Sequence, residues 1–160
     1  MIEEETLPAS RAPSDAAPAN AHAYELPVRY GDTDQMGIAY YANYLYWFEI
    51  ARTEWLRANG KSYRELEAEG VILPVTEAYC RYLASARYDD RLRLWGWVGV
   101  LGRATVQFDY RIERVDDNRL LAVGHTRHCF LDRAGRPMRI EGTLHDLLAR
   151  GLPNATPHAR

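Results

Sequence analysis

The chain has 160 residues, of which 47% are hydrophobic and 26% charged, and its formal net charge is −2. A chain of this length forms one domain with a core large enough to fold without disulfides or metal. The small net charge gives no reason to expect nucleic acid or an anionic membrane as a partner. No apolar run approaches the about 18 residues needed to span a bilayer, so no membrane association is expected.

The two ends of the chain have the composition of tails. Residues 1–22 are rich in Ala, Pro, Ser and acids and lack apolar periodicity, so we expect a disordered N-terminal tail. An acidic start without a continuous apolar stretch is unlike a signal peptide, and we expect a cytoplasmic protein. Residues 151–160 predict a flexible C-terminal tail, which leaves residues 23–150 as the domain.

The domain opens with a strand and a polar turn. Residues 24–30 predict a short strand, and Pro27 within it favours a position at the edge of a sheet. The turn that follows carries two carboxylates, Asp32 and Asp34, before Gly37. Aspartates in turns commonly cap helices or make Asx-turns, so both acids have a structural interpretation beside a catalytic one.

A long helix comes next. The apolar and aromatic run from Tyr40 to Phe48 continues into an amphipathic stretch, and Asn59-Gly60 is a typical helix stop, so we expect a helix over residues 41–58. The first half of this helix has no clear polar face, which predicts that it is buried. An acid in the turn at the mouth of a buried helix is a candidate catalytic group.

Beyond the helix the hydrophobic period changes from helical to strand-like. Ser62 and Glu65 form a capping-box pattern that predicts one or two further helical turns. Alternation with a period of two, interrupted by turn residues, then predicts strands over residues 71–83, 91–101, 106–113 and 120–131, a short strand piece at 138–140 and a brief C-terminal helix around Leu144.

This order of elements is α+β: a strand, one long helix, then consecutive antiparallel strands. The simplest packing is an antiparallel sheet wrapped around the helix, with pairing to a second copy covering exposed edges. Cys80 and Cys129 lie far apart in strand-like runs and are expected to be free thiols. His125 and His128 are three apart in a predicted strand, so they point to opposite faces and no metal site is expected.

The helix and its turn carry a resemblance to a known family. The motif elements are, in order, Asp32-Thr33-Asp34, Met36-Gly37, an aromatic pair at 40–41, Asn43-Tyr44, and downstream Tyr88-Asp89-Asp90. Together they resemble the hotdog-fold acyl-CoA thioesterases of the 4-hydroxybenzoyl-CoA thioesterase type, over residues 24–140. The resemblance implies a curled antiparallel sheet around one central helix, a homodimer or a tetramer of two dimers with sites at the dimer interface, and hydrolysis of acyl-CoA to free acid and CoA without metal or cofactor.

The same resemblance implies roles for individual residues. The catalytic carboxylate maps to Asp34, and the thioester carbonyl is implied to bind the backbone N–H of Tyr41, with Gly37 nearby. Many relatives have His where this chain has Tyr41, which leaves Asp34 as the one obvious catalytic side chain. Ser85 stands where relatives often have Pro. Arg87 and Arg103 are candidates for binding the CoA phosphates, because arginine pairs well with phosphate. The alternative interpretation of each is an ordinary surface arginine.

These residue types suit thioester hydrolysis. The first N–H groups of a helix lack internal partners and stabilise a developing oxyanion. Asp34 can act as a general base on water or as a nucleophile through a mixed anhydride, and the acyl group can be aromatic or aliphatic. The alternatives are a thioesterase for acyl chains on a carrier protein, or a non-catalytic acyl-CoA-binding protein. A hotdog hydratase is disfavoured because no Asp/His pair lies near the helix.

Overall fold

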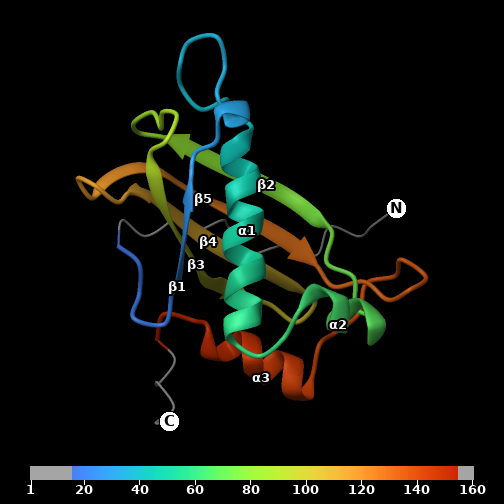
Figure 1. Cartoon of the computed structure of the whole chain (residues 1–160). Helices are drawn as coiled ribbons and strands as arrows, with labels where there is room; N and C mark the ends of the chain where they lie inside the picture. Colours follow the sequence, from blue (N-terminus) through green and yellow to red (C-terminus); the bar gives the residue numbers. More distant parts are fainter. Residues whose placement is uncertain (1–15, 155–160) are drawn as a thin grey trace.

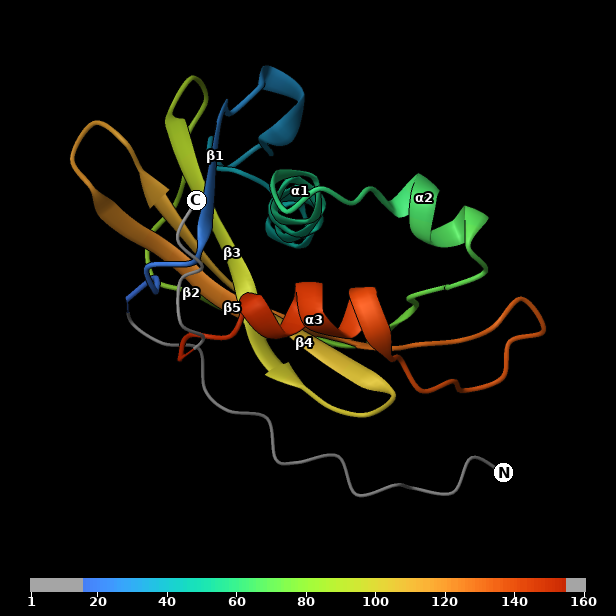
Figure 2. The same ribbon diagram turned by 90° about the horizontal axis from the view of Figure 1, so that it is seen from below.

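The computed structural model describes residues 16–154, which form a five-stranded sheet curled around one long helix (Figure 1). The elements in chain order are β1 (His22–Pro27), the 3-10 turn η1 (Tyr30–Asp32), α1 (Asn43–Ala58), α2 (Tyr63–Ala68), β2 (Val75–Tyr82), β3 (Arg91–Leu101), β4 (Thr105–Arg114), β5 (Arg119–Cys129) and α3 (Gly142–Arg150). Viewed along α1, the sheet curves around one side of the helix (Figure 2). The α+β class and the hotdog architecture predicted from the sequence are confirmed.

The strand order is β1-β3-β4-β5-β2, and all neighbouring pairs are antiparallel. Pro27 therefore lies in an edge strand, as predicted, because proline lacks the N–H that a central strand needs. β2 is the other edge. It directly follows the helical part of the chain in sequence but lies at the far side of the sheet from β1.

The predicted boundaries hold best where the alternation is strongest. β3 spans the predicted residues, and β4 extends the predicted 106–113 by one residue at each end. β1 was placed two to three residues too late, since it begins at His22 and ends at Pro27. The short strand piece predicted at 138–140 is wrong: these residues form no strand, although Met138 N–H donates to the Phe130 carbonyl at 2.9 Å.

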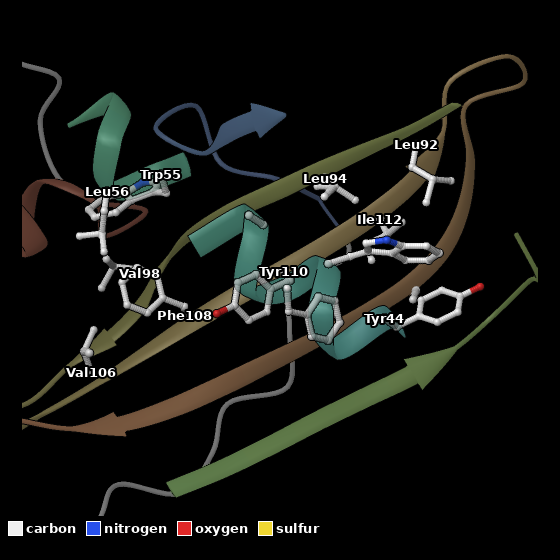
Figure 3. Close-up of a cluster of buried hydrophobic side chains, with 14 of the residues drawn as sticks. Tyr44, Trp55, Leu56, Leu92, Leu94, Val98, Val106, Phe108, Tyr110 and Ile112 are labelled. Atoms are coloured by element: carbon white, nitrogen blue, oxygen red, sulfur yellow. The ribbon is translucent and has the colours of Figure 1, made fainter. Parts of the chain in front are cut away.

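The core lies between α1 and the face of the sheet that it covers (Figure 3). Phe48 of α1 stacks on Tyr110 of β4 with ring centroids 4.5 Å apart, and Trp55 meets Phe108 edge-on at 5.6 Å. Gly124 of β5 makes room for this packing, because a Cβ there would lie 2.5 Å from Phe48 Cε2. Each fully buried large apolar side chain contributes about 1.5–3 kcal/mol, so this layer holds helix and sheet together.

The prediction that the first half of α1 is buried is wrong for the single chain. Tyr44, Trp47 and Phe48 are buried, but Tyr46 is 62% exposed and Leu45 40% exposed. One helix against one face of a sheet can bury only one side of itself, and within residues 16–154 no second layer covers the other side (Figure 2). Exposed apolar side chains therefore remain near the start of α1.

A buried polar cluster joins the second half of α1 to the sheet. Arg52 donates from Nε to the Tyr63 hydroxyl at 2.6 Å, and from Nη1 to the Tyr110 hydroxyl and to Thr126 Oγ1, both at 3.3 Å. His128 Nε2 lies 2.9 Å from Thr126 Oγ1. Burial, and then the Arg52 charge, lower the pKa of His128 to about 4, while burial raises the pKa of Tyr63 to about 12.

His125 and His128 point to opposite faces of β5, as predicted. His125 Nε2 lies 2.6 Å from Glu77 Oε1 on the face turned away from α1, whereas His128 packs edge-on against Phe108 on the α1 side. None of the helices within residues 16–154 is long and apolar enough to span a membrane.

The ends of the domain differ from the predicted tails. His22 belongs to β1, and Asn20 Nδ2 donates to the Arg150 carbonyl at 3.0 Å. Gly151 is buried against Trp55, and Leu152 packs on the core, so the C-terminal tail does not begin at residue 151. The rest of both predicted tails, residues 1–15 and 155–160, lies outside the described residues.

Candidate active site

The candidate site is built on a tight hairpin between η1 and α1. Thr33 and Ala39 form an antiparallel bridge, and the Asp34 N–H donates to the Ile38 carbonyl at 2.9 Å. Gly37 closes the hairpin by donating to the Asp34 carbonyl at 3.0 Å, with a φ of +73° that favours glycine. Gly37 therefore fixes the backbone that carries Asp34.

The two aspartates of the turn have different surroundings. The Asp32 carboxylate accepts from the Arg29 N–H at 2.8 Å, a contact that holds the start of η1. Asp34 is half-buried, and its Oδ1 accepts from the Met36 N–H at 2.8 Å in an Asx-turn. Within the described part of the chain, Asp34 Oδ2 has no hydrogen-bond partner. One oxygen of Asp34 is thus held by the turn, and the other can bind a water molecule or a substrate.

The turn is tied to the start of α1 through the Asp32 carbonyl. That oxygen accepts from the Tyr40 N–H at 2.8 Å and from Asn43 Nδ2 at 2.7 Å. The amide of Asn43, the first residue of α1, thereby holds the chain two residues before Asp34. The carboxylate and the helix start form one hydrogen-bonded unit.

The first turn of α1 leaves two backbone donors open. The N–H groups of residues 43–45 donate to the carbonyls three residues earlier, at 2.9, 3.3 and 3.1 Å. The N–H groups of Tyr41 and Ala42 have no acceptor among residues 16–154, and the cap residue Ala42 has no side-chain oxygen that could fold back. Such donors carry the partial positive charge of a helix N-terminus and suit a carbonyl oxygen or an oxyanion.

A pocket of about 260 Å³ lies beside these donors. It is lined by Ile38, Ala39, Tyr41, Tyr44, Tyr82, Leu83, Ala84 and Ser85. The walls come from the Asp34 hairpin, the start of α1 and the end of β2, so three elements meet here. Its lining is mostly aromatic and small apolar, which is typical of a site that takes an organic ligand.

The segment after β2 is held against the same unit. The Ala86 N–H donates to the Tyr44 hydroxyl at 3.1 Å, and the Ala86 carbonyl accepts from the Ala39 N–H at 2.8 Å. These bonds form although Ser85 replaces the frequent Pro. Arg87 Nη1 reaches the Gly37 carbonyl at 3.5 Å, so the structure brings Arg87 to the Asp34 hairpin.

Arg103 lies elsewhere. It follows the end of β3, where its carbonyl accepts from the Ile140 N–H at 3.2 Å, and it lines a separate pocket with Arg139 and His145. This pocket borders α3, at the end of α1 opposite to the Asp34 hairpin (Figure 1). At about 1.5 Å per residue, the 16 residues of α1 separate the two ends by about 24 Å. One chain therefore does not bring Arg103 to Asp34.

One further contact at the site leaves no signal in the sequence. The hydroxyl of Tyr82, the last residue of β2, donates to the Tyr41 carbonyl at 3.0 Å. The two residues are 41 positions apart and meet only because β2 pairs at the edge of the sheet beside the helix start. Cys80 of the same strand is not a second nucleophile, because burial raises the pKa of its thiol to about 11.

Comparison with known proteins gives consistent matches. The sequence profile of the thioesterase-like superfamily matches residues 28–152. A putative acyl-CoA thioesterase of Bacillus subtilis is 39% identical over 74 residues, which are 46% of this chain and 54% of that protein. The acyl-CoA thioester hydrolase YbgC of Escherichia coli is 35% identical over 103 residues, 63% of this chain and 77% of the relative.

A solved structure agrees with the sequence matches. The DHNA-CoA thioesterase from Staphylococcus aureus superposes with a TM-score of 0.74 at 30% sequence identity. The superposition covers 79% of this chain and 85% of that one. The likeness thus extends over most of the sheet and helix that carry the candidate site.

Proposed function

The chain belongs to the thioesterase-like superfamily and is a thioester hydrolase, and on this basis we propose that it hydrolyses acyl-CoA to a free acid and CoA with Asp34 as the catalytic carboxylate. The observation that carries the proposal is the hydrogen-bonded unit of the Asp34 hairpin and the helix start. In that unit, the Tyr40 N–H and Asn43 Nδ2 both donate to the Asp32 carbonyl. These two bonds tie the Asp34 turn to the helix start. The turn carries Asp34 Oδ2, which has no partner among the described residues, and the helix start carries the two open N–H groups.

The open donors suit the carbonyl of the thioester. When a nucleophile adds to the acyl carbon, the carbonyl oxygen gains negative charge, and the N–H of Tyr41 is positioned to stabilise it, with the N–H of Ala42 beside it. Collapse of this intermediate breaks the C–S bond and releases the CoA thiolate. Thiolate is a good leaving group, so the reaction has little need of the acid/base His that many relatives carry at position 41.

Asp34 has two possible parts in this step. As a general base it takes a proton from water, and the hydroxide adds to the acyl carbon. As a nucleophile its free oxygen adds directly, expels the thiolate and leaves a mixed anhydride that water then hydrolyses. A single turnover in H₂¹⁸O tests the anhydride: ¹⁸O incorporated into the Asp34 carboxylate requires it, whereas a label found only in the product acid is expected for the general base and also for an anhydride that water opens at the acyl carbon.

The acyl group and the CoA group have different candidate sites. We place the acyl group in the pocket lined by Tyr41, Tyr44 and Tyr82, whose aromatic walls suit an aryl or an aliphatic chain. Arg87 at the hairpin is the candidate for a CoA phosphate. Arg103, about 24 Å away along α1, can reach the phosphates only of an extended CoA or of a substrate bound to a second subunit.

The exposed edge of the sheet supports a homodimer. β2 has no strand partner on its outer side within the described residues, and it carries apolar side chains such as Val75, which is 50% exposed. Long, exposed apolar edge strands are templates for pairing with another chain. We propose that two copies join at β2 and that dimers pair further into a tetramer. A strictly monomeric mass at micromolar concentration would contradict this.

Release of free thiol from a panel of aryl and alkyl acyl-CoAs tests the function. We expect Asp34→Asn to lose at least about 10²-fold in turnover, the lower limit for removing a general base. Asp32→Asn is the matched control: it makes the same chemical change two residues away, in a carboxylate that only holds η1. Equal activity of Asp34→Asn and wild type would refute the role of Asp34.

Two outcomes of the same assay point to other functions. Hydrolysis of acyl groups on a carrier protein, but not on CoA, would make the protein a carrier-protein thioesterase. Tight binding of acyl-CoA without hydrolysis of any thioester would make it a non-catalytic acyl-CoA-binding protein. Replacing Tyr41 by its α-hydroxy acid analogue removes the N–H and also weakens the Tyr40 carbonyl, which accepts from the Asn43 N–H. With the fold checked by its melting temperature, this variant tests the oxyanion site separately; we expect about 10²–10³-fold loss of kcat.

A further inference from the structure

One side-chain bond joins the edge strand β2 to the start of α1. The Tyr82 hydroxyl donates to the Tyr41 carbonyl at 3.0 Å, and the Tyr82 ring packs edge-on against Tyr44 with centroids 5.1 Å apart. Tyr44 in turn accepts from the Ala86 N–H. The hydroxyl of Tyr82 is thus held in place by its own ring packing and is not a freely moving surface group.

The bonded carbonyl lies between the two open donors. It belongs to the peptide unit whose N–H is that of Ala42, and its own residue supplies the N–H of Tyr41. The same carbonyl also accepts from the Tyr44 N–H at the longer distance of 3.3 Å. A second donor on a peptide carbonyl fixes the orientation of that peptide and polarises its N–H, because hydrogen bonds in a chain strengthen one another.

The Tyr82 hydroxyl remains a hydrogen-bond donor over the pH range in which enzymes usually work. Partial desolvation of the hydroxyl, and then the neighbouring Cys80, raise the pKa of Tyr82 to about 12, so the proton stays on the phenol at neutral and mildly alkaline pH. A phenylalanine would keep the ring and its contact with Tyr44 but would leave the Tyr41 carbonyl with the weaker Tyr44 bond alone.

We propose that Tyr82 is a positioning residue for thioester hydrolysis, which holds the Tyr41 carbonyl so that the N–H groups of Tyr41 and Ala42 are directed at the substrate carbonyl. This rests on the proposed function. Because Tyr82 ends the strand through which the proposed dimer pairs, the same bond links subunit pairing to the oxyanion site. Pairing of β2 with a second copy restrains the end of the strand and, through Tyr82, the helix start.

Tyr82→Phe tests the proposal. We expect kcat to fall about 10–10²-fold, less than for complete loss of an oxyanion donor, with KM within about twofold of wild type. Tyr24→Phe is the matched control, because Tyr24 lies on the other edge strand, β1, is 39% exposed against 46% for Tyr82, and its hydroxyl has no hydrogen-bond partner among the residues that the structure describes. It should leave kcat, KM and the dimer mass unchanged.

A spectroscopic measurement separates positioning from a general loss of structure. In ¹H–¹⁵N spectra, Tyr82→Phe should shift the Ala42 amide proton upfield, since its peptide carbonyl loses a donor, while Tyr24→Phe should not. The melting temperature and the oligomeric mass should match wild type in both variants. A shift spread over the whole domain, or a lost dimer, would mean that Tyr82 acts on the fold and would overturn the proposal.

The remaining outcomes distinguish the two proposals. If Tyr82→Phe keeps full kcat while Asp34→Asn is inactive, the positioning role is wrong and the proposed function stands. If KM rises and kcat does not change, Tyr82 binds substrate equally in the ground and transition states, which also overturns positioning. If the wild-type protein hydrolyses no thioester, both proposals fail.

Discussion

The buried polar cluster in the second half of α1 has its hydrogen-bond partners within the protein, whereas two N–H groups at the start of the helix have none among the described residues. In its second half, the buried Arg52 is bonded to three hydroxyl groups, one of which continues to His128. At its start, the N–H groups of Tyr41 and Ala42 have no acceptor in the described chain, and Tyr46 is largely exposed. We call the second half of α1, around Arg52, its closed end, because the polar cluster there is paired within the protein and stabilises the fold. We call the start, at Tyr41 and Ala42, its open end, because its N–H groups are left for a substrate or another molecule.

The difference has a simple energetic reason. A buried polar group without a partner costs about 1–3 kcal/mol, so a cluster inside the core must be satisfied by the protein itself. At the open end, water can satisfy the same kinds of group until a substrate or a second subunit replaces it. Changes at the closed end are expected to appear in the free energy of unfolding, and changes at the open end in catalysis.

The largest expected effect on folding is at Trp55. This side chain is fully buried, and its Nε1 has no hydrogen-bond partner in the described residues, so Trp55→Ala removes packing alone. We expect a loss of about 3–5 kcal/mol in the free energy of unfolding, measured by urea denaturation. Tyr46→Ala, on the exposed side of the same helix, should change it by less than about 0.5 kcal/mol. Similar losses in both variants would contradict the one-sided burial of α1.

The next effect is a dependence on pH that arises from His128. Its pKa falls from 6.5 to about 4 on folding, so the unfolded chain binds one more proton between these pH values. Stability therefore falls as the pH is lowered from 6.5 to 4, by about 3 kcal/mol at about 1.4 kcal/mol per pH unit. Denaturation curves at pH 7 and pH 4 measure this loss.

Carboxylates also lose stabilising contacts in acid, so the His128 contribution needs its own control. His128→Gln keeps a polar side chain beside Thr126 but does not titrate. The variant should be less stable than wild type at pH 7 and should lose less stability between pH 7 and pH 4. Parallel pH profiles for the two proteins would show that His128 is not kept neutral by its surroundings.

A smaller loss is expected for Arg52→Lys. Lysine keeps the positive charge but lacks the planar fork that reaches Tyr63 on one side and Tyr110 on the other. Losing one or two such bonds should cost about 2 kcal/mol in the free energy of unfolding. Arg57→Lys is the matched control, since Arg57 pairs with Glu54 on the exposed side of α1, and it should be nearly neutral. Equal effects would mean that the fork geometry of Arg52 is unimportant.

The elements of the fold, including the two ends of α1, differed in how well the sequence predicted their bounds. Strict alternation placed β3 correctly and β4 within one residue, and Asn59-Gly60 marked the end of α1. The start of α1 was placed two residues too early, because its cap residue Ala42 has no side-chain oxygen and so leaves no signal in the sequence. Patterns that repeat along the chain can be read from sequence, whereas an uncapped helix start cannot.

The same limit applies to the candidate site. The turn with Asp34 and Gly37 is local in sequence, and its residues could be picked out before the structure was known. The bond from Tyr82 to the Tyr41 carbonyl depends on which strand lies at the edge next to the helix, and no local pattern encodes that. Burial of the whole first half of α1 was predicted wrongly because its composition does not reveal how many layers surround it.

The smallest expected effect tests whether the open end works through its backbone. Tyr41 is 62% exposed, and its ring packs on Tyr40, while the proposed oxyanion donor is its main-chain N–H. Tyr41→Phe keeps that N–H, the ring and the carbonyl held by Tyr82. We therefore expect kcat to change by less than about threefold, far below the 10²-fold effect of removing a catalytic acid or base. A loss near 10²-fold would mean that the phenol takes part in proton transfer. The position would then do the work of the His found in many relatives, and the open end would hold two catalytic side chains where the proposed mechanism needs one.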